Sequence, residues 1–421
     1  MFRLLLNSIL LIAAVIIGVA NYNGLPTSAL DVRDSLLPMM WRYSGIEPVN
    51  NNCHVVEGVE ACEDAKYDEE SGLVFMACGN AEARKKWFPG TGFFMDPETA
   101  RHQVDQIFVF DPKTEKIQNV HVKDFEGHTF TSHGLDVFTL KDGTKIIAAV
   151  NHKADASVIS FFKVNHPGEV AYIGEIKDDL LKIPNSVALF YTPEGQLGFV
   201  ATNDHVEREG PKRQVAEILG LKATYLVYCA VDIDNGVTGK CHKVADHLVY
   251  PNGIAHIPGT HDFVQSDSRD AKIKHWSWNS TSQKLDLNSA TMVGAPMDNV
   301  RVIPGTKDVM VAAFPNVLQV MHKYKNMDDK NSRVKTVGLR LNHNEGYKIP
   351  HVIHKSNDDY GVFVNTVYNY FPKENKILAG SCFAKGLVVC NGPDGAQAQN
   401  IVEEEVNKNV DIDEDEEEDE D

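Results

Sequence analysis

The sequence lacks several motifs that would assign a chemistry directly. It has no CxxC pair, which argues against a structural zinc site or a thioredoxin-type redox site. It has no GxSxG segment, which argues against a serine nucleophile elbow. Positive charge is also scarce, with 41 Lys and Arg against 59 Asp and Glu in 421 residues. Because no basic stripe is evident in the sequence, we expect no nucleic-acid partner.

The two ends of the chain differ in composition from the rest. The first twenty residues, MFRLLLNSILLIAAVIIGVA, combine an early Arg3 with a long apolar run and a small-residue end. This pattern predicts a signal peptide or an uncleaved signal anchor in residues 1–20, followed by an N-terminal segment in 21–50. Residues 403–421 hold thirteen acidic residues and one lysine. We expect a disordered acidic tail over 396–421, because it has almost nothing apolar to bury.

The N-terminal pattern predicts that the rest of the chain enters an oxidising compartment. We therefore expect a secreted or secretory-lumen protein, associated with a membrane only if residues 1–20 remain as an anchor. The sequon NST marks Asn279 as a glycosylation candidate.

The seven cysteines leave at least one without a partner in the chain. Cys229 and Cys241 flank a turn-rich connection between two strand-like runs, which suggests a disulfide across a hairpin. The sequence leaves the partners of three others open: Cys62, Cys78 and Cys382.

A strand-like unit recurs along the chain. NGIAHIPGT at Asn252 and DNVRVIPGT at Asp298 both begin with a polar residue, pass through apolar alternation and turn at Pro-Gly-Thr. Related segments are followed by an apolar run and, in most units, by a third strand-like piece such as VLQVMHKY at 317–324. The six units begin at Glu63, His133, Asn185, Asn252, Asp298 and His351. Such repeats predict an all-β protein, a six-bladed β-propeller over residues 51–395.

A propeller must also join its first blade to its last. The strand-like CHVVEGV at 53–59 precedes the first unit, and GLVVCN at 386–391 ends the last. We predict that the N-terminal strand pairs into the last blade and that Cys53 forms a disulfide with Cys390. In the chain-entropy view, closing so long a loop stabilises the fold by about 4–5 kcal/mol.

The polar starts of the units predict a metal site. The first strand of each blade lines the central channel, so these residues should converge near the axis. The oxygen donors among them and beside them are Glu63, Asn185, Asn252, Asp298 and Asn299. Two carboxylates and three amides are hard ligands that suit Ca²⁺ better than zinc. One Asn or Asp at a strand start is more often a turn residue, but its recurrence at one register favours calcium.

Two histidines are candidates for proton transfer. His133 begins the second unit, and His152 ends the next strand of the same blade. Neighbouring imidazoles can pass a proton from a water molecule to bulk solvent near neutral pH. We interpret His133 as a general base with His152 as its partner, although the spacing alone fits two structural histidines equally well. His351 is interpreted as a hydrogen-bonded spacer in the channel.

At these positions the chain resembles the serum paraoxonase/arylesterase family, calcium-dependent lactonases on a six-bladed propeller. The resemblance covers about residues 50–392 and rests on ordered matches that include SHGL, VNHKADA, IPNS, TNDH, LGLKATYLVY, YPNGI and MDNV. It implies a dyad of His133 and His152 and a disulfide between Cys53 and Cys390. It also implies that the catalytic calcium is bound by Glu63, Asn185, Asn252, Asp298 and Asn299.

The resemblance further implies a second, structural calcium, for which Asp64 and Leu135 match. Ser186 stands where that family has an aspartate, so the second site should be weak or missing. The segment 207–225 corresponds to a membrane- and lipoprotein-associating helix, but its polar start EREGPKRQ does not favour membrane docking. The rim of the pocket has its own composition, so substrate preference does not carry over. Its aromatic residues are Trp87, Phe88, Phe93, Phe94 and Phe314.

We therefore expect a calcium-dependent hydrolase of carboxylic esters, with a small lactone or aryl ester as substrate. The metal polarises the carbonyl, and His133 activates the attacking water. A phosphotriesterase or sugar lactonase on the same metal is an alternative within this class. The alternative from another class is a secreted binding propeller in which calcium is purely structural.

Overall fold

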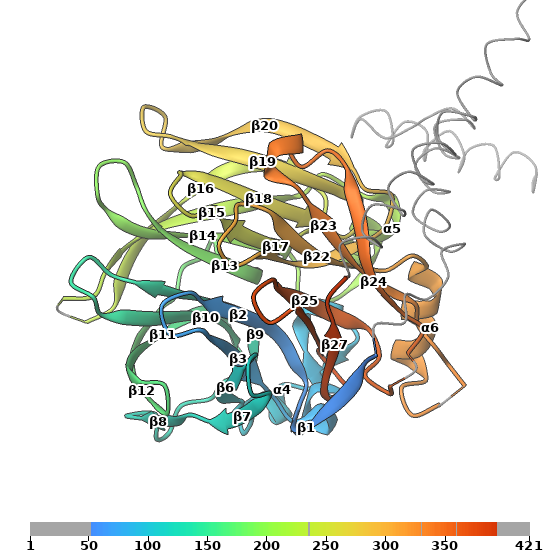
Figure 1. Ribbon diagram of the computed structural model, residues 1–421. Coiled ribbons are helices and arrows are strands. Elements are labelled where there is room, and N and C mark those ends of the chain that lie inside the picture. Colours follow the sequence, from blue (N-terminus) through green and yellow to red (C-terminus); the bar gives the residue numbers. More distant parts are fainter. Residues whose placement is uncertain (1–51, 235, 330, 359, 394–421) are drawn as a thin grey trace, which may run out of the picture.

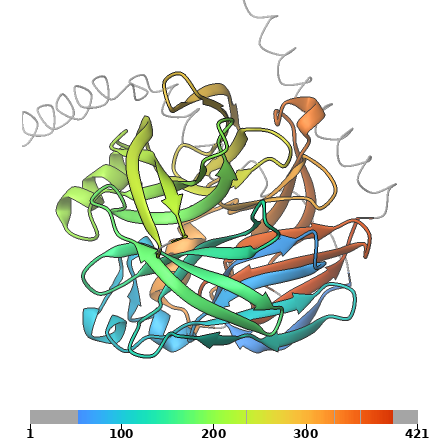
Figure 2. The same cartoon turned by 90° about the vertical axis from the view of Figure 1, so that its left-hand side faces the viewer.

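The computed structural model describes residues 52–393, except 235, 330 and 359. These residues form six β-sheets arranged as the blades of a propeller, as predicted (Figures 1 and 2). The predicted segments 1–20, 21–50 and 396–421 lie outside the described residues. Residues 51, 394 and 395, at the two ends of the predicted propeller range, also lie outside them.

The first three blades follow one another along the chain, and each begins with its inner strand, except that a short edge strand precedes the inner strand of blade 2. Blade 1 contains β2 (Cys62–Asp68), β3 (Leu73–Cys78), β6 (Gln106–Asp111) and β7 (Lys116–Asn119). Blade 2 contains β9 (Ser132–Thr139), β10 (Lys145–His152), β11 (Ser157–His166), β12 (Glu169–Ile176) and the short edge strand β8 (His121–Lys123). Blade 3 contains β13 (Ile183–Tyr191), β14 (Leu197–His205), β15 (Thr224–Asp232) and β16 (Thr238–Leu248).

The other three blades complete the ring. Blade 4 contains β17 (Pro251–His256), β18 (Asp262–Asp267), β19 (Lys272–Asn279) and β20 (Lys284–Met292). Blade 5 contains β21 (Met297–Val302), β22 (Val309–Ala313), β23 (Thr336–Leu341) and β24 (Pro350–Ser356). Blade 6 contains β25 (Asn365–Phe371), β26 (Lys376–Ser381), β27 (Lys385–Asn391) and, at its outer edge, β1 (His54–Glu60).

The core of the protein lies between neighbouring blades. Each inner strand contacts the inner strand of the next blade, so that β2, β9, β13, β17, β21 and β25 enclose one channel. Apolar side chains fill the spaces between the faces of adjacent sheets, as where Ile146 and Phe161 of blade 2 pack with Val187 of blade 3. Burial on both faces explains why the inner and second strands read as nearly continuous apolar runs.

The ring closes as predicted from the two ends of the repeat region. Strand β1 pairs antiparallel with β27, with Val55 opposite Val388. The disulfide between Cys53 and Cys390 joins the same two strands across a separation of 337 residues.

The prediction of the last two units contains two errors. VLQVMHKY lies in helix α6 (Val317–Lys325) and not in a strand. The Asn316 side chain caps this helix by accepting hydrogen bonds from the backbone of Leu318 and Gln319, which satisfies donors that a strand would pair with its neighbour. As a result β23 and β24 complete blade 5, and His351 lies on its outermost strand and not at the channel. The sixth inner strand is β25, where Thr366 takes the polar position.

Several short elements besides α6 lie outside the blades. They are α3 (Ala81–Arg84), β4 (Trp87–Phe88), η1 (Pro89–Thr91), β5 (Phe94–Met95), α4 (Pro97–Ala100), α5 (Pro211–Leu219) and η2 (His343–Glu345) in chain order. Of these, β4, η1 and α5 lie next to the predicted site, whereas η2 lies beside β24 and bonds His351. Within the described part of the chain, no helix has the length and apolar character needed to span a bilayer.

Candidate active site

The five predicted calcium ligands come together at one end of the channel. Asn299 Nδ2 donates to Glu63 Oε1 at 2.8 Å, and the Asn252 and Asp298 side chains are hydrogen bonded. Asn185 Nδ2 lies 3.2 Å from His133 Nε2, which is itself 3.6 Å from Glu63 Oε1. None of the five ligands is more than 8% exposed. Four inner strands thus bring residues that are distant in sequence into one buried cluster.

Each of these five side chains has one oxygen atom without a hydrogen-bond partner among the described residues. These atoms are Glu63 Oε2, Asn185 Oδ1, Asn252 Oδ1, Asp298 Oδ1 and Asn299 Oδ1. Buried polar atoms are normally paired, since leaving one unsatisfied costs roughly 1–3 kcal/mol. Five unpaired oxygens in one cluster therefore fit a cation that accepts several oxygen ligands, as Ca²⁺ does.

The electrostatics of the cluster lead to the same conclusion. Burial raises the pKa of the Asp298 carboxyl well above its ordinary value, and the nearby negative charge of Glu63 raises it further. Two carboxylates in one desolvated site repel each other. A divalent cation bound between them would offset this repulsion.

The predicted histidine pair is present and is oriented by a hydrogen-bonded chain. His133 Nδ1 lies 3.0 Å from His152 Nε2, and His152 Nδ1 lies 3.0 Å from Ser157 Oγ. Ser157 Oγ donates to the Lys182 carbonyl at 3.2 Å and accepts from Arg208 Nη2 at 3.0 Å. Because the Asn185 amide donates to the lone pair of His133 Nε2, this order assigns the His133 proton to Nδ1 and makes Nε2, beside Glu63, the acceptor nitrogen.

Both imidazoles are held in the neutral form near pH 7. Burial lowers the pKa of His133, although the charges of Glu63 and Asp204 oppose that effect. Burial lowers the pKa of His152 further, and neighbouring positive charges act in the same direction. A neutral imidazole can accept a proton, which a general base must do.

Residues 87–95, here called the cover segment, lie directly over the histidine pair. The Phe88 ring is 4.7 Å from the His133 ring, and Trp87 Nε1 donates to the His152 carbonyl at 2.8 Å. A Cβ on Gly90 would lie 2.7 Å from His133 Cε1, so only glycine allows the backbone to pass this closely. Of the predicted rim residues, Phe93 is exposed, whereas Phe314 packs against α6.

Helix α5 holds the cover segment in place. Arg213 Nη1 donates to the Pro89 carbonyl at 2.7 Å, and Nη2 donates to the Gly90 carbonyl at 2.6 Å. Arg213 Nε pairs with Glu217 one turn later at 2.8 Å. In this protein the polar face of the insertion therefore binds the cover of the site.

The donors expected for a second calcium have another partner. Both carboxylate oxygens of Asp64 accept hydrogen bonds from the Arg301 guanidinium, and the Leu135 carbonyl accepts one from Arg301 Nη2 at 3.2 Å. Ser186 is buried and packs against Gly134, the residue before Leu135.

The structure also contains a disulfide between Cys229 and Cys241 and another between Cys62 and Cys78. The disulfide between Cys62 and Cys78 fixes the residue that precedes Glu63. The sequence left this pairing open because it depends on the pairing of β2 with β3, which places Cys62 opposite Cys78. Cys382 is buried and is the free cysteine of the described region. Asn279 ends β19, and its glycosylation stays a prediction.

Sequence reasoning missed four functional neighbours. Ser157 lies directly opposite His152 in the β10–β11 hairpin, so strand pairing could have revealed it. Thr366 donates to the Glu63 carbonyl at 2.7 Å, but the misplaced sixth unit concealed it. Arg208 and Arg213 come from the insertion, and nothing in their local sequence indicates the distant contacts they make.

Comparison with known proteins shows which family the sequence matches. A family model described as Arylesterase matches residues 45–391. Human serum paraoxonase/lactonase 3 is 28% identical over 356 residues, which cover 81% of this chain and 90% of that protein. Human serum paraoxonase/arylesterase 1 is 25% identical over 352 residues, with the same two coverages of 81% and 90%. The structure of a luciferin-regenerating enzyme aligns with 83% of this chain and 96% of its own, at 10% identity and a TM-score of 0.46. Because the family model spans most of the sequence, the chain belongs to the arylesterase (paraoxonase) family.

Proposed function

We propose that this protein is a calcium-dependent hydrolase of carboxylic esters, acting on small lactones or aryl esters. The observation that carries the proposal is the cluster of five unpaired oxygens beside a neutral, oriented histidine pair. Membership of the family supports it, as do relatives whose names describe lactonases and arylesterases.

Calcium would be held by Glu63, Asn185, Asn252, Asp298 and Asn299. When bound, the ion supplies a Lewis acid that polarises the ester carbonyl and stabilises the developing oxyanion. The protein keeps these ligands in register through the inner strands, and Thr366 and Asn299 bond the Glu63 carbonyl from two other blades.

His133 Nε2 removes a proton from the attacking water. The single lone pair of Nε2 faces the ligand cluster and accepts from the Asn185 amide in this structure, so the attacking water must replace that amide at Nε2 before it gives up its proton. The proton on His133 Nδ1 can then shift toward His152 Nε2, which stabilises the charge on the first imidazole. Ser157 is a positioning residue, because it fixes the His152 ring through Nδ1.

The cover segment shields this chemistry from bulk water. With both histidines and all five ligands buried, substrate must reach the site past residues 87–95. Phe88 places an apolar surface against His133, which suits an apolar acyl or aryl group.

We also propose that the protein works in the secretory pathway or outside the cell. Three disulfides are present in the described residues, and such bonds persist in oxidising compartments.

The proposal is tested by hydrolysis of a panel containing lactones, phenyl acetate, a sugar lactone and a phosphotriester. Purified residues 21–421 are assayed as prepared, after chelation, and after calcium is restored. We expect lactone or phenyl acetate hydrolysis to disappear on chelation and to return with calcium. A preference for the phosphotriester or the sugar lactone would favour the alternative within the class.

His133→Gln separates an enzyme from a binding propeller. We expect kcat to fall about 10²–10⁴-fold, because that is the usual contribution of a general base. His351→Gln is the matched control, since His351 lies on the outer strand β24 and its side chain bonds Glu345 of the same blade. Full activity of His133→Gln would refute its role as the base. Absence of hydrolysis in the wild type, together with a melting temperature raised by calcium, would favour a binding propeller.

A further inference from the structure

A buried arginine lies on the channel axis next to the proposed calcium site. Arg301 is on β21, two residues after Asn299, and only 2% of its surface is exposed. Its Nε donates to Asp64 Oδ1 at 2.8 Å, and its Nη2 donates to Asp64 Oδ2. Nη2 also donates to the Leu135 carbonyl at 3.2 Å, so one guanidinium ties together β2, β9 and β21.

The oxygen atoms that contact Arg301 have hydrogen-bond partners, unlike those of the calcium cluster. Asp64 Oδ1 also accepts from the Ala65 backbone at 2.9 Å, and Oδ2 accepts from the Leu135 backbone at 2.9 Å. Both oxygens of Asp64 are therefore satisfied by the protein itself. In the calcium cluster, each of the five side chains keeps one oxygen without a partner. The oxygens of the calcium cluster therefore lack a partner that a cation would supply, whereas the oxygens of Asp64 do not.

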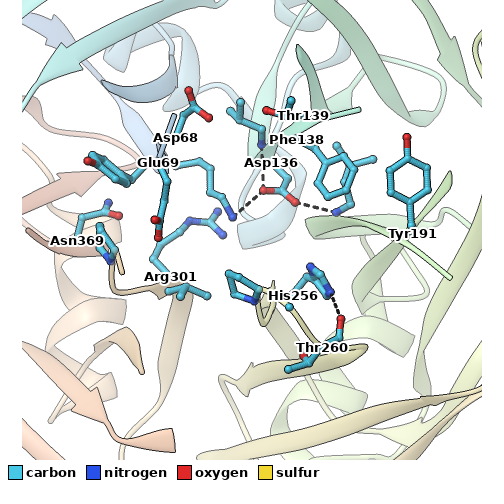
Figure 3. Close-up of a pocket in the computed structure, with 18 of the residues that line it drawn as sticks. Asp68, Glu69, Asp136, Phe138, Thr139, Tyr191, His256, Thr260, Arg301 and Asn369 are labelled. Carbon is cyan, nitrogen blue, oxygen red and sulfur yellow. Dashed lines mark hydrogen bonds and ion pairs between the residues drawn. The ribbon is translucent and has the colours of Figure 1, made fainter. Parts of the chain in front are cut away.

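The charges in this part of the channel are balanced without a metal. A guanidinium stays protonated at neutral pH, so Arg301 contributes one positive charge here. Lys66 Nζ pairs with Asp136 Oδ1 at 2.9 Å farther along the channel. Beyond these pairs the channel opens into a cavity of about 650 Å³, and Figure 3 shows Arg301 and Asp136 among its lining residues. Arg301 pairs with Asp64 and Lys66 pairs with Asp136, so neither of these two carboxylates needs a divalent ion to neutralise it.

We propose that the Arg301 guanidinium permanently fills the position at which Asp64 and Leu135 would bind a second calcium, so that the folded chain takes up one calcium ion. The residue at position 186 is consistent with Arg301 taking the place of a calcium ion. A serine in place of an aspartate removes one negative charge, and Arg301 supplies a positive charge where a divalent ion would supply two. This inference takes the first calcium from the proposed function, but its test counts ions and does not measure hydrolysis.

The test compares calcium bound per chain in the wild type and in the double variant Arg301→Ser/Ser186→Asp. Ions are counted by elemental analysis after equilibrium dialysis against calcium, and binding is followed by titration calorimetry. We expect one ion in the wild type and one additional ion in the double variant. Arg340→Ser is the matched control, because Arg340 pairs with Asp308 on the partly exposed side of blade 5 and should leave the count unchanged.

The single variants show whether Arg301 acts as a structural cation. Arg301→Ser should melt at a lower temperature, since Asp64 is left buried and unpaired. Adding Ser186→Asp should restore melting temperature only when calcium is present. A wild-type count of two ions would overturn the proposal, as would a folded double variant that binds no more calcium than the wild type. If the double variant does not fold, the wild-type count decides. A wild-type count of zero with one ion gained in the double variant would contradict the first calcium site and still support the role of Arg301.

Discussion

At the scale of single residues, the proposed function depends on a histidine that is both buried and neutral. His133 is enclosed by Phe88, the Gly90 backbone and the ligand cluster, so its charged form is poorly solvated. This environment lowers its pKa from the ordinary value of 6.5. A bound cation nearby would act in the same direction.

The pH dependence of turnover follows from that shift. Only neutral His133 can accept the proton of water, so activity is retained above its pKa and lost as pH falls through it. We expect kcat/KM for a neutral ester to be level from about pH 8 to pH 6.5 and to decline, with one proton taken up, below 6.5. A pH profile measured at calcium saturation checks this. An acid limb centred above pH 6.5 would show that another group, with a raised pKa, controls the rate.

The ligand residues show how far residue-level prediction reaches. Four of the five proposed ligands start a repeated unit with a polar side chain and Asn299 follows the fourth, so alignment of the repeats was enough to select them. Asp64 had the same kind of side chain one position later. Its partner Arg301 lies more than two hundred residues away, and no local pattern indicates that pairing.

At the scale of elements, α5 and the cover segment form one hydrogen-bonded unit over the proposed site. The helix belongs to blade 3 in sequence but contacts a segment that follows β3 of blade 1. Arg213 makes the connection through two backbone carbonyls, and Tyr250 OH adds a bond to the Gly90 carbonyl at 3.3 Å.

Arg213→Gln should therefore loosen the cover segment. Hydrogen bonds from a charged group contribute roughly 1.5–3 kcal/mol each, so amide exchange in residues 87–95 should speed up at least about tenfold. Hydrolysis of bulky esters should rise relative to small ones, because the opening is wider. Hydrogen exchange measured by mass spectrometry checks the first effect. Lys212→Gln, on an exposed neighbour in the same helix, is the control, and equal exchange in both variants would contradict the role of Arg213.

Strands were predicted well wherever an alternation of apolar and polar residues ended at turn residues. The first five blades have the inner strands expected from their polar starts. The third strand of blade 5 departs from the prediction because α6 is inserted between β22 and β23. The apolar residues of VLQVMHKY fit either period over so short a length, and the cap at Asn316 settles the choice in favour of helix.

At the scale of the whole molecule, the propeller depends on closure between its first and last strands. Strand β1 adds to blade 6 by hydrogen bonds, and the disulfide between Cys53 and Cys390 makes that closure covalent. Without it, blade 6 could separate from blade 1 and open the channel that holds the site.

Removing this disulfide should cost more stability than removing the one in the β15–β16 hairpin. The chain-entropy estimate is about 5 kcal/mol for a very long loop and about 3 kcal/mol for a loop of some fifteen residues. The separations here are 337 and 12 residues. Denaturant unfolding of Cys53→Ser/Cys390→Ser and of Cys229→Ser/Cys241→Ser, each with calcium present, checks the difference. Equal losses would mean that strand pairing alone closes the ring.

The sequence by itself determined the strands of the first blades, the closing strand and the polar register, because alternation, turns and repeats are local patterns read along one chain. The tertiary structure alone decided which side chains share the axis of the channel. Arg301 reaches Asp64, Arg213 reaches the cover segment and Thr366 reaches Glu63 only after six sheets pack around a ring. Those contacts depend on the angle between blades and on side-chain reach, and neither quantity is encoded in the residues next to each partner.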